Sequence, residues 1–299
     1  MIKILITGKG GQLAWELEKT CPSQYIITCL DSVQLDITKR QQVFDSIAKI
    51  KPDIVINAAA YTAVDNAETD QTTAYAVNAT GCEYIAQACK EHNAELIHIS
   101  TDFVFDGDQS IPYQTDNKPN PINVYGASKL QGEITVSDIL GSHATIIRTA
   151  WVYSAHGNNF VKSMLRLMVE KDQLGIVYDQ VGTPTWAKGL AVMIWSLINK
   201  KIDDQLDHAK ESHLLHWTDA GVASWYDFAI AIQELALEKG LLKVAIPIKP
   251  ISSSAYPTAA KRPCFSVIDK LTAEKHSGVD TMHWRKQLST MLDELKTQS

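Results

Sequence analysis

Apolar positions in the first half of the chain follow two spacings. Short continuous apolar runs are typical of strands buried on both faces, whereas apolar residues three or four apart are typical of amphipathic helices. The runs predict strands at Ile2–Thr7, Tyr25–Leu30, 53–60, 95–105 and 144–152. Helical spacing occurs between them, at Leu13 and Leu17, over 43–50 and over 74–91. This alternation predicts βαβ units, so we expect an α/β fold with a Rossmann-type, doubly wound parallel sheet.

The pattern changes after about residue 152. Helical spacing follows over 160–171, 184–200, 225–238 and 284–295, and strand-like runs lie at 175–178, 214–217 and 246–251. Residues 203–212 and 252–263 have the polar composition of loops. We therefore expect a Rossmann domain over residues 1–152 and a smaller mixed α/β domain over 153–299, with some segments returning to the first. The second domain is expected to cover the carboxyl edge of the sheet.

Composition excludes several classes of function. Of the 299 residues, 45% are hydrophobic and 21% are charged, which is ordinary for a globular protein. The formal net charge of -6 argues against broad attraction to nucleic acid or anionic membranes, although a local basic pocket is compatible with it. No apolar run reaches the roughly 18 residues that a membrane helix needs. The first residues run into a strand without a charged leader, so we expect a cytoplasmic protein.

Cysteines and histidines show no metal-binding pattern. The five cysteines are an odd number without CxxC spacing, which favours packed thiols over disulfides or a zinc site. His98 lies in an apolar strand and His216 stands next to Trp217, and neither has the spacing of a metal ligand. Candidate chemistry therefore has to come from other residues.

A glycine-rich turn follows the first predicted strand. Residues 8–14 have the spacing G-x-x-G-x-x-A, with Gly8 and Gly11 as the glycines and Ala14 in the third position. Glycine lets backbone N–H groups approach a pyrophosphate, and the following helix adds the partial positive charge of its N-terminus. Such turns are common, but one directly after an N-terminal strand predicts dinucleotide binding.

Acidic residues after the second strand bear on which dinucleotide binds. Asp31 lies about 20 residues beyond the glycine turn, where a carboxylate accepts hydrogen bonds from ribose hydroxyls and repels a 2′-phosphate. This favours NADH, while Lys9, Lys39 and Arg40 leave NADPH open. We place Asp36 at the adenine edge, with the N-cap of the next helix as its alternative role.

Tyr125 and Lys129 are the candidate catalytic pair. Four residues apart on a helix, a phenol and an ammonium lie on one face. The ammonium favours the tyrosinate and lowers the pKa of the tyrosine, which suits acid–base work on an alcohol or ketone oxygen. Ser100 or Thr101, at a carboxyl end of the sheet, can hold that oxygen, although turn capping is the usual role of such residues. With the glycine turn, this pair predicts a NAD(P)-dependent oxidoreductase.

Together these motifs resemble the extended short-chain dehydrogenase/reductase family and, within it, the dTDP-4-dehydrorhamnose reductases. The resemblance extends over nearly the whole chain. It rests on residues 8–14, 35–38, 57–65, 100–107, 125–129, 148–153, 182–185 and 262–263.

The resemblance implies roles at the cofactor for residues spread over the first domain. The implied cofactor residues are Gly8, Gly11, Gln12 and Leu13 at the pyrophosphate, Asp31, Asp36 and Ile37 at the adenosine, and Ala60, Tyr61, Thr62, Ile99, Tyr125 and Lys129 along the cleft. The second domain would then mainly bind substrate.

The implied reaction reduces the C4 ketone of dTDP-4-dehydro-β-L-rhamnose to give dTDP-β-L-rhamnose. NADH or NADPH would supply hydride and Tyr125 the proton. Thr101 and Asp102 would contact the substrate and Trp151 would pack on the sugar, with core packing as the alternative for Trp151. Related 4,6-dehydratases carry a Glu after the Thr–Asp pair to remove the C5 proton. Phe103 stands at that position here and cannot take a proton, which favours simple reduction.

Candidates for the substrate phosphates are Arg262 and Asn159, followed by Arg148, with structural pairing as the alternative role of each. Some members of the family form homodimers around Mg²⁺ that is held by carboxylates. Glu16 matches one such ligand, but Lys188 stands at the usual acidic position, and an ammonium cannot ligate Mg²⁺. This substitution argues against a metal bridge and leaves Mg²⁺ binding and dimerisation open.

Two other functions remain open at this point. One is a sugar-nucleotide epimerase, which keeps NAD tightly bound and returns the hydride. The other is a non-catalytic regulatory subunit that resembles the β subunit of methionine adenosyltransferase, which shares many of these motifs. The intact pair of Tyr125 and Lys129 argues for catalysis without excluding the second alternative.

Overall fold

The computed structural model describes residues 1–202 and 213–298, so the loop predicted at 203–212 lies outside the described residues. Within them, a six-stranded parallel sheet has the order β10–β5–β4–β3–β1–β2. Its strands are β1 (Ile2–Thr7), β2 (Tyr25–Leu30), β3 (Ile54–Asn57), β4 (Glu95–Thr101), β5 (Ala144–Thr149) and β10 (His213–His216). The apolar runs of β1, β3 and β5 are buried, as expected for strands covered on both faces. The predicted Rossmann-type α/β fold is confirmed.

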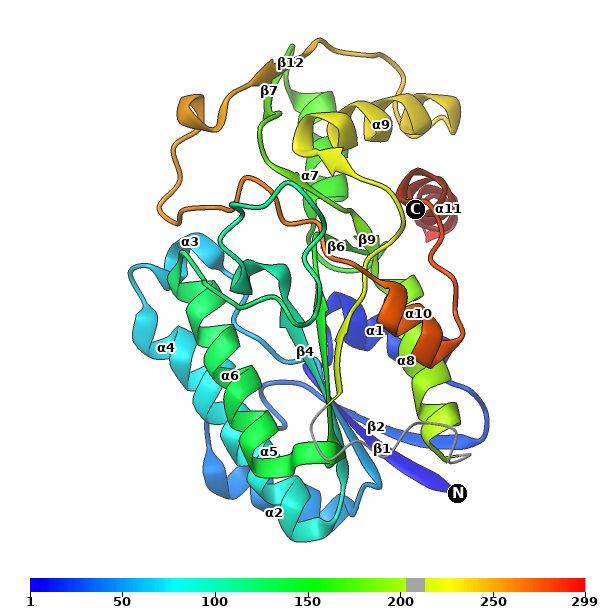
Figure 1. Ribbon diagram of the computed structural model, residues 1–299. Helices are drawn as coiled ribbons and strands as arrows, with labels where there is room; N and C mark the ends of the chain where they lie inside the picture. The colour runs from blue at the N-terminus through cyan, green and yellow to red at the C-terminus, as the bar shows by residue number, and fades with distance from the viewer. Residues whose placement is uncertain (203–212, 299) are drawn as a thin grey trace.

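Helices cover both faces of this sheet (Figure 1). On one face lie α2 (Arg40–Ile50), α5 (Gly81–His92) and α6 (Val124–Leu140), and on the other lie α1 (Gln12–Thr20) and α8 (Ala187–Ile202). The predicted apolar stripe of α1 faces the sheet, because Leu13 and Leu17 are buried with the side chains of β1. Each helix thus meets the sheet through an apolar side.

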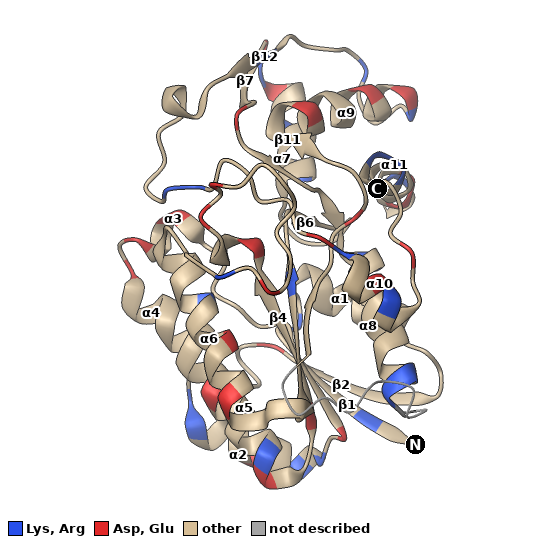
Figure 2. Ribbon diagram, viewed as in Figure 1, with Lys and Arg blue, Asp and Glu red and all other residues tan. Residues whose placement is uncertain are grey.

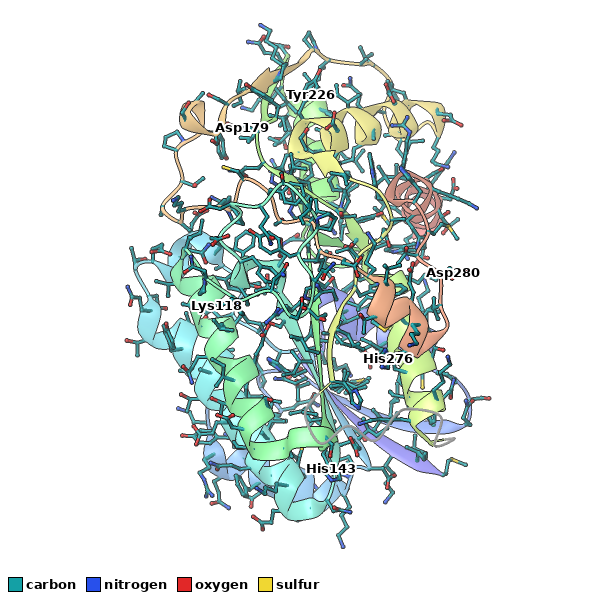
Figure 3. All side chains as sticks on the ribbon, viewed as in Figure 1. Lys118, His143, Asp179, Tyr226, His276 and Asp280 are labelled. Carbon is teal, nitrogen blue, oxygen red and sulfur yellow. The ribbon has the colours of Figure 1, made fainter. Side chains whose placement is uncertain are left out.

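A second unit lies beyond the carboxyl end of the sheet (Figure 1). Its helices α7 (Phe160–Glu170), α9 (Trp225–Glu238) and α11 (Trp284–Gln298) enclose an apolar core of their own. Short paired strands complete it: β6 (Val152–Tyr153) with β9 (Thr185–Trp186), β7 (Leu174–Val177) with β12 (Ile248–Ile251), and β8 (Val181–Gly182) with β11 (Ala223–Ser224). Beside β7, Asp179 accepts the N–H of Ser253 at 2.8 Å and anchors the turn η4 (Ser253–Ala255) (Figure 3).

Several elements from the second half of the chain belong to the sheet layer, including α10 (Leu271–Ser277), which packs on α8 and β10. β10 pairs with β5 at one edge of the sheet, and α8 packs on α1. The chain therefore leaves the sheet after β5, builds part of the second unit and returns to the sheet before it completes that unit.

Several predicted elements differ from the structure. The strand predicted over 53–60 ends at Asn57. The strand predicted over 95–105 ends at Thr101, because its hydroxyl accepts the N–H of Phe103 and begins the turn η2 (Asp102–Val104). The strand predicted over 144–152 ends at Thr149. The helix predicted over 74–91 is divided into α4 (Gln71–Tyr75), the π-helical turn η1 (Ala76–Thr80) and α5. The short helices α3 (Val64–Ala67) and α10 (Leu271–Ser277) were not predicted.

Acidic and basic residues are interspersed along the ribbon in Figure 2. Separately, no helix in the described part of the chain is long and apolar enough to cross a membrane.

Asp219 is a buried carboxyl group beside the start of α8. It is 1% exposed, and its Oδ2 accepts the N–H of Trp186 at 3.0 Å. Burial raises the pKa of Asp219 to about 8, and hydrogen bonds from Trp186 and Gln287 oppose the shift. Because the pKa is higher in the folded than in the unfolded chain, proton uptake favours folding. The resulting stabilisation is complete at acidic pH and is lost as the pH rises toward 8.

We predict that Asp219→Asn removes this pH dependence, because an amide oxygen can still accept the N–H of Trp186 but does not ionise. Relative to the wild type, the free energy of unfolding of the variant should increase by about 1.4 kcal/mol for each pH unit between about 5 and 8. Urea unfolding of both proteins across this range measures the difference. A difference that is constant with pH would show that Asp219 does not titrate there in the folded protein.

Candidate active site

The glycine-rich turn joins β1 to α1 at the carboxyl edge of the sheet. Gly8 has a φ of +76°, and a Cβ at this position would lie 2.8 Å from the backbone of Ala59. The N–H of Gly11 closes the turn by donating to the Gly8 carbonyl at 3.0 Å. Among the described residues, no side chain caps α1 and no acidic residue lies in its first turn. Its N–H groups and partial positive charge therefore suit an anionic group such as a pyrophosphate.

A cavity of about 560 Å³ adjoins this turn. Small-molecule sites typically measure roughly 300–1,000 Å³. The cavity lies where the strand order reverses, at the ends of β1 and β3, which is where open α/β sheets bind ligands. Most of the predicted cofactor residues line it: Gly8, Gly11, Gln12, Leu13, Asp36, Ile37, Ala60, Tyr61 and Thr62.

Asp31 lies outside the lining of this cavity, at the end of β2. Its Oδ1 accepts the N–H groups of Val33 and Gln34, at 2.9 and 2.8 Å. These hydrogen bonds fix the carboxylate in the turn next to Ser32, which does line the cavity. A ribose contact by Asp31 therefore remains a prediction.

Asp36 lines the cavity but has a different local role from the predicted alternative. Its Oδ1 accepts the hydroxyl of Thr38 at 2.7 Å and the Thr38 N–H at 3.0 Å. The hydroxyl bond is the main reason that the pKa of Asp36 is lowered. Asp36 does not cap the next helix, because α2 begins at Arg40 with Lys39 in the N-cap position. The N-cap interpretation was therefore wrong, and the carboxylate instead stabilises a turn at the cavity rim.

Tyr125 and Lys129 lie one turn apart on α6, as their spacing predicts. Tyr125 is hydrogen-bonded to the side chain of Thr101, at the carboxyl end of β4. Burial raises the pKa of Tyr125 to about 12, and the charge of Asp102 adds to the shift, while the bond to Thr101 opposes it. The expectation that Lys129 lowers this pKa was wrong, because burial dominates. The phenol is therefore protonated at neutral pH.

Lys129 is 1% exposed and donates from Nζ to the backbone carbonyl of Ile99 at 2.6 Å. Burial lowers the pKa of Lys129, and the charge of the nearby Glu133 opposes the shift. The hydrogen bond ties α6 to β4. It holds Lys129, and Tyr125 one turn earlier, at the carboxyl end of β4. Ile99, Tyr125 and Lys129 are not among the residues that line the cavity.

Phe103 packs edge-on against Tyr125, with ring centroids 5.7 Å apart and planes at 76°. The side chain next to the phenol is therefore aromatic and cannot accept a proton. Asp102 is 2% exposed, and burial raises its pKa to about 6. Its Oδ1 accepts the Thr101 hydroxyl at 3.1 Å, so the carboxyl group orients this hydroxyl. This burial argues against the predicted direct contact of Asp102 with substrate.

Asn78, in the π-helical turn η1, is a site residue that the sequence did not reveal. Its side chain accepts the N–H of Tyr61 at 2.9 Å and donates to the Tyr61 carbonyl at 3.1 Å. It also donates to the hydroxyl of Ser128 on α6 at 3.0 Å. Asn78 thus connects the cavity wall to the helix that carries Tyr125. A π-helical turn is frequent at functional sites, but it has no pattern that distinguishes it from a helix in the sequence.

Trp151 has a φ of +46°, a strained conformation for a bulky residue. Such strain gathers at functional sites. Its ring is stacked on Trp225, the first residue of α9, with centroids 3.5 Å apart and planes at 7°. Gly182 lies against the same ring, where a Cβ would come within 2.7 Å. Because Trp225 covers one face, the predicted sugar contact of Trp151 has to use the remaining surface of the ring.

Asn159, a predicted phosphate ligand, is fully engaged within the protein. Its oxygen caps α7 by accepting the N–H of Lys162 at 3.1 Å. Its nitrogen donates to the side chain of Gln12 at 2.9 Å and to the carbonyl of Ser154 at 2.7 Å. These hydrogen bonds argue against a phosphate contact and make Asn159 a connection between the two units.

The two predicted arginines also have partners. Arg262 forms a bidentate ion pair with Asp65 on α3, with N···O distances of 2.7 and 3.2 Å. Arg148 is buried and pairs with Glu133 at 2.6 Å. Arg148 therefore has the structural pairing role that was the alternative to phosphate binding. At Arg262, a substrate phosphate would have to compete with the carboxylate of Asp65.

The surroundings of Glu16 do not fit Mg²⁺. Glu16 is fully buried, it accepts the Ser154 hydroxyl at 2.8 Å, and burial raises its pKa. Nearby, Lys188 lies 3.1 Å from a carboxylate oxygen of Glu294, which also pairs with Lys19. Within the described residues, no group of three or more His, Cys, Asp or Glu side chains could hold a metal ion. Two ammonium groups stand where Mg²⁺ would need oxygen ligands, which argues against the predicted role of Glu16.

Comparison with known proteins finds matches over nearly the whole chain. A family model described as the RmlD substrate binding domain matches residues 2–297. The dTDP-4-dehydrorhamnose reductase of Aggregatibacter actinomycetemcomitans is 39% identical over 97% of this chain and 98% of its own.

Two solved structures are similar to this chain over its full length. A dTDP-4-dehydrorhamnose reductase from Clostridium acetobutylicum has a TM-score of 0.90 at 38% identity and covers 99% of this chain and 100% of its own. The dTDP-4-dehydrorhamnose reductase of Bacillus anthracis, solved in complex with NADP, has a TM-score of 0.88 at 36% identity. That match covers 98% of this chain and 100% of the other.

We predict that neither Mg²⁺ nor EDTA changes the midpoint of thermal unfolding, because an ion that bound the folded state would raise it. Lys188→Glu provides the matched contrast, since it places a third carboxylate beside Glu16 and Glu294. Its midpoint should rise with added Mg²⁺ and fall again with EDTA. A wild-type midpoint that rises with Mg²⁺ would contradict our interpretation of this cluster.

Proposed function

This chain belongs to the family of the RmlD substrate binding domain, and on that premise we propose that it reduces dTDP-4-dehydro-β-L-rhamnose to dTDP-β-L-rhamnose with NADH or NADPH. The reaction is a step of dTDP-rhamnose biosynthesis. The observation that carries the proposal is the group formed by Thr101, Tyr125 and Lys129 at the carboxyl end of β4, together with a glycine-lined cavity at the same edge of the sheet.

The cavity residues fit a dinucleotide. Backbone N–H groups at Gly11, Gln12 and Leu13 would bind the pyrophosphate at the uncapped start of α1. Asp36 and Ile37 would hold the adenosine end, with Asp31 at the ribose. Tyr61 and Thr62 would form the wall of the cleft toward the nicotinamide. When bound, NAD(P)H supplies the hydride that C4 of the sugar accepts.

The side chains of the protein supply the proton. Thr101 and Tyr125 are hydrogen-bonded to each other, so both hydroxyls can approach one ketone oxygen. As C4 is reduced, that oxygen becomes an alkoxide, which is a stronger base than a phenolate, and it takes the proton from the Tyr125 hydroxyl. The raised pKa of Tyr125 keeps this proton in place until then. Lys129, one helical turn away, donates to the Ile99 carbonyl and so keeps Tyr125 at the carboxyl end of β4.

Phe103 limits the chemistry to reduction. Removal of the C5 proton, as in a dehydratase, needs a base next to the ketone. The position beside Tyr125 is occupied by an aromatic ring, and the neighbouring carboxyl group of Asp102 is buried and bonded to Thr101. Tyr125 therefore protonates a reduced ketone and has no partner for an elimination.

Two further assignments belong to this proposal. NAD(P)H and dTDP-sugars are made in the cytoplasm, which supports a cytoplasmic location. Homodimerisation follows only from the family resemblance, and the pairing of Lys188 with Glu294 argues against Mg²⁺ as its bridge. Size-exclusion chromatography with light scattering measures the oligomeric state.

The direct test supplies the purified protein with dTDP-4-dehydro-β-L-rhamnose and follows the absorbance of NADH and of NADPH. Oxidation of either, with dTDP-β-L-rhamnose as product, is the expected result. If neither is oxidised, the reductase assignment fails. Protein that purifies with tightly bound NAD and interconverts sugar epimers without net oxidation would be an epimerase instead.

We predict that Tyr125→Phe lowers kcat by about 10²–10⁴-fold, the usual contribution of a general acid. Binding of NADPH should remain within about twofold, because the ring and its contact with Phe103 are retained. Tyr178→Phe is the control, since Tyr178 is an exposed tyrosine in the second unit. Steady-state kinetics and NADPH fluorescence measure the two effects. Near-normal turnover of Tyr125→Phe would show that another group donates the proton.

A further inference from the structure

Residues 154–158, called the strap below, lead from β6 to the start of α7 and lie against the glycine turn. His156 makes two contacts there. Its Nε2 lies 3.0 Å from the carbonyl oxygen of Gly10, and the ring is the donor because a carbonyl oxygen only accepts. Its ring also stacks on Trp15 of α1, with centroids 5.2 Å apart and planes at 6°. A side chain of the strap is thus held by the turn and by the helix that follows it.

Both ends of the strap are tied to α1 as well. At its start, Ser154 donates to the buried carboxylate of Glu16 at 2.8 Å. Just beyond its end, Asn159 donates to the side chain of Gln12 at 2.9 Å. Glu16 and Gln12 both lie on α1, so the strap spans the N-terminal half of that helix.

The middle of the strap forms part of the cavity. Gly157 and Asn158 line it together with Gly8, Gly10 and Gly11 of the glycine turn. Gly157 has a φ of +73°, and a Cβ there would lie 3.3 Å from the side chain of Gln12. The cavity that suits a pyrophosphate is therefore bounded by two backbone segments from different units.

We propose that the strap closes over the pyrophosphate of bound NAD(P)H, and that His156 is the positioning residue that keeps it closed. A dinucleotide between the glycine turn and the strap leaves only after His156 has released Gly10. The strap therefore acts on the residence time of the cofactor, because the contact of His156 with Gly10 has to break before the cofactor can pass. This inference rests on the dinucleotide binding proposed above and adds that the second unit controls release of the cofactor.

The test measures the affinity and the dissociation rate of NADPH by fluorescence, including stopped-flow displacement, in the absence of sugar substrate. His156→Ala should raise the dissociation rate by about tenfold, the effect expected when a hydrogen bond and a ring contact are lost. The association rate should rise as well, because the cofactor enters through the same opening, so Kd should change less than either rate. His156→Phe keeps the ring and His156→Gln keeps a donor, so each should show a smaller increase.

His143→Ala is the matched control, because His143 is an exposed histidine at the far end of the sheet, where it pairs with Glu95 (Figure 3). Its dissociation rate should equal that of the wild type. Thermal unfolding shows whether each variant is folded, and the two conservative variants carry the test if His156→Ala does not fold. A structural role alone would lower the unfolding midpoint without raising the dissociation rate.

The outcomes separate this inference from the proposed reaction. If the wild type binds NADPH but does not reduce the sugar, the reaction is wrong and the strap is still tested by the dissociation rates. If folded His156 variants have dissociation rates within about twofold of the wild type, the proposed role of the strap is wrong. A wild type that binds neither NADH nor NADPH overturns it as well.

Discussion

The close approach of α6 to the carboxyl end of β4 determines where the proposed catalytic groups lie. Gly126 permits this approach, because a Cβ there would lie 2.1 Å from the carbonyl oxygen of Phe103. Lys129 can then reach the carbonyl of Ile99. A buried ammonium is strongly destabilising unless it is hydrogen-bonded, so this contact sets the position of the helix. Tyr125 lies one turn earlier on the same face, and its phenol consequently meets Thr101.

A second buried charge extends the same arrangement to the edge of the sheet. Arg148 on β5 pairs with Glu133 on α6 and lies over the ring of Phe105. His216 on β10 lies 3.4 Å from the same guanidinium, and burial lowers its pKa to about 3, so the imidazole is neutral and accepts. Buried ion pairs often add little to stability compared with apolar residues. We interpret this one as an orienting contact, since it joins α6 to β5 and, through His216, to β10, which lies 68 residues further along the chain.

The residues that were predicted well are those whose neighbours are close in sequence. The glycine turn needs only a strand before it and a helix after it, and Tyr125 and Lys129 share a face because of helical spacing alone. Arg262 was harder to predict, because its carboxylate partner, Asp65, is 197 residues away. The sequence identifies the positive charge of an arginine but not the residue that pairs with it. Asn78 was missed for a related reason, because the π-helical turn that aims it at Tyr61 depends on packing against α6.

The segment between β5 and α7 explains how two separate apolar cores produce one site. Near its start, Trp151 stacks on Trp225 of the second unit, and the carbonyl of Val152 accepts the side chain of Gln12. A few residues later, His156 lies on the glycine turn. Hydride transfer needs its reacting atoms held about 3–3.5 Å apart and aligned. A connection this short allows little relative movement between the surface proposed for the sugar and the cavity proposed for the cofactor. The alignment that the reaction requires is therefore set mainly by the path of the chain, before either molecule binds.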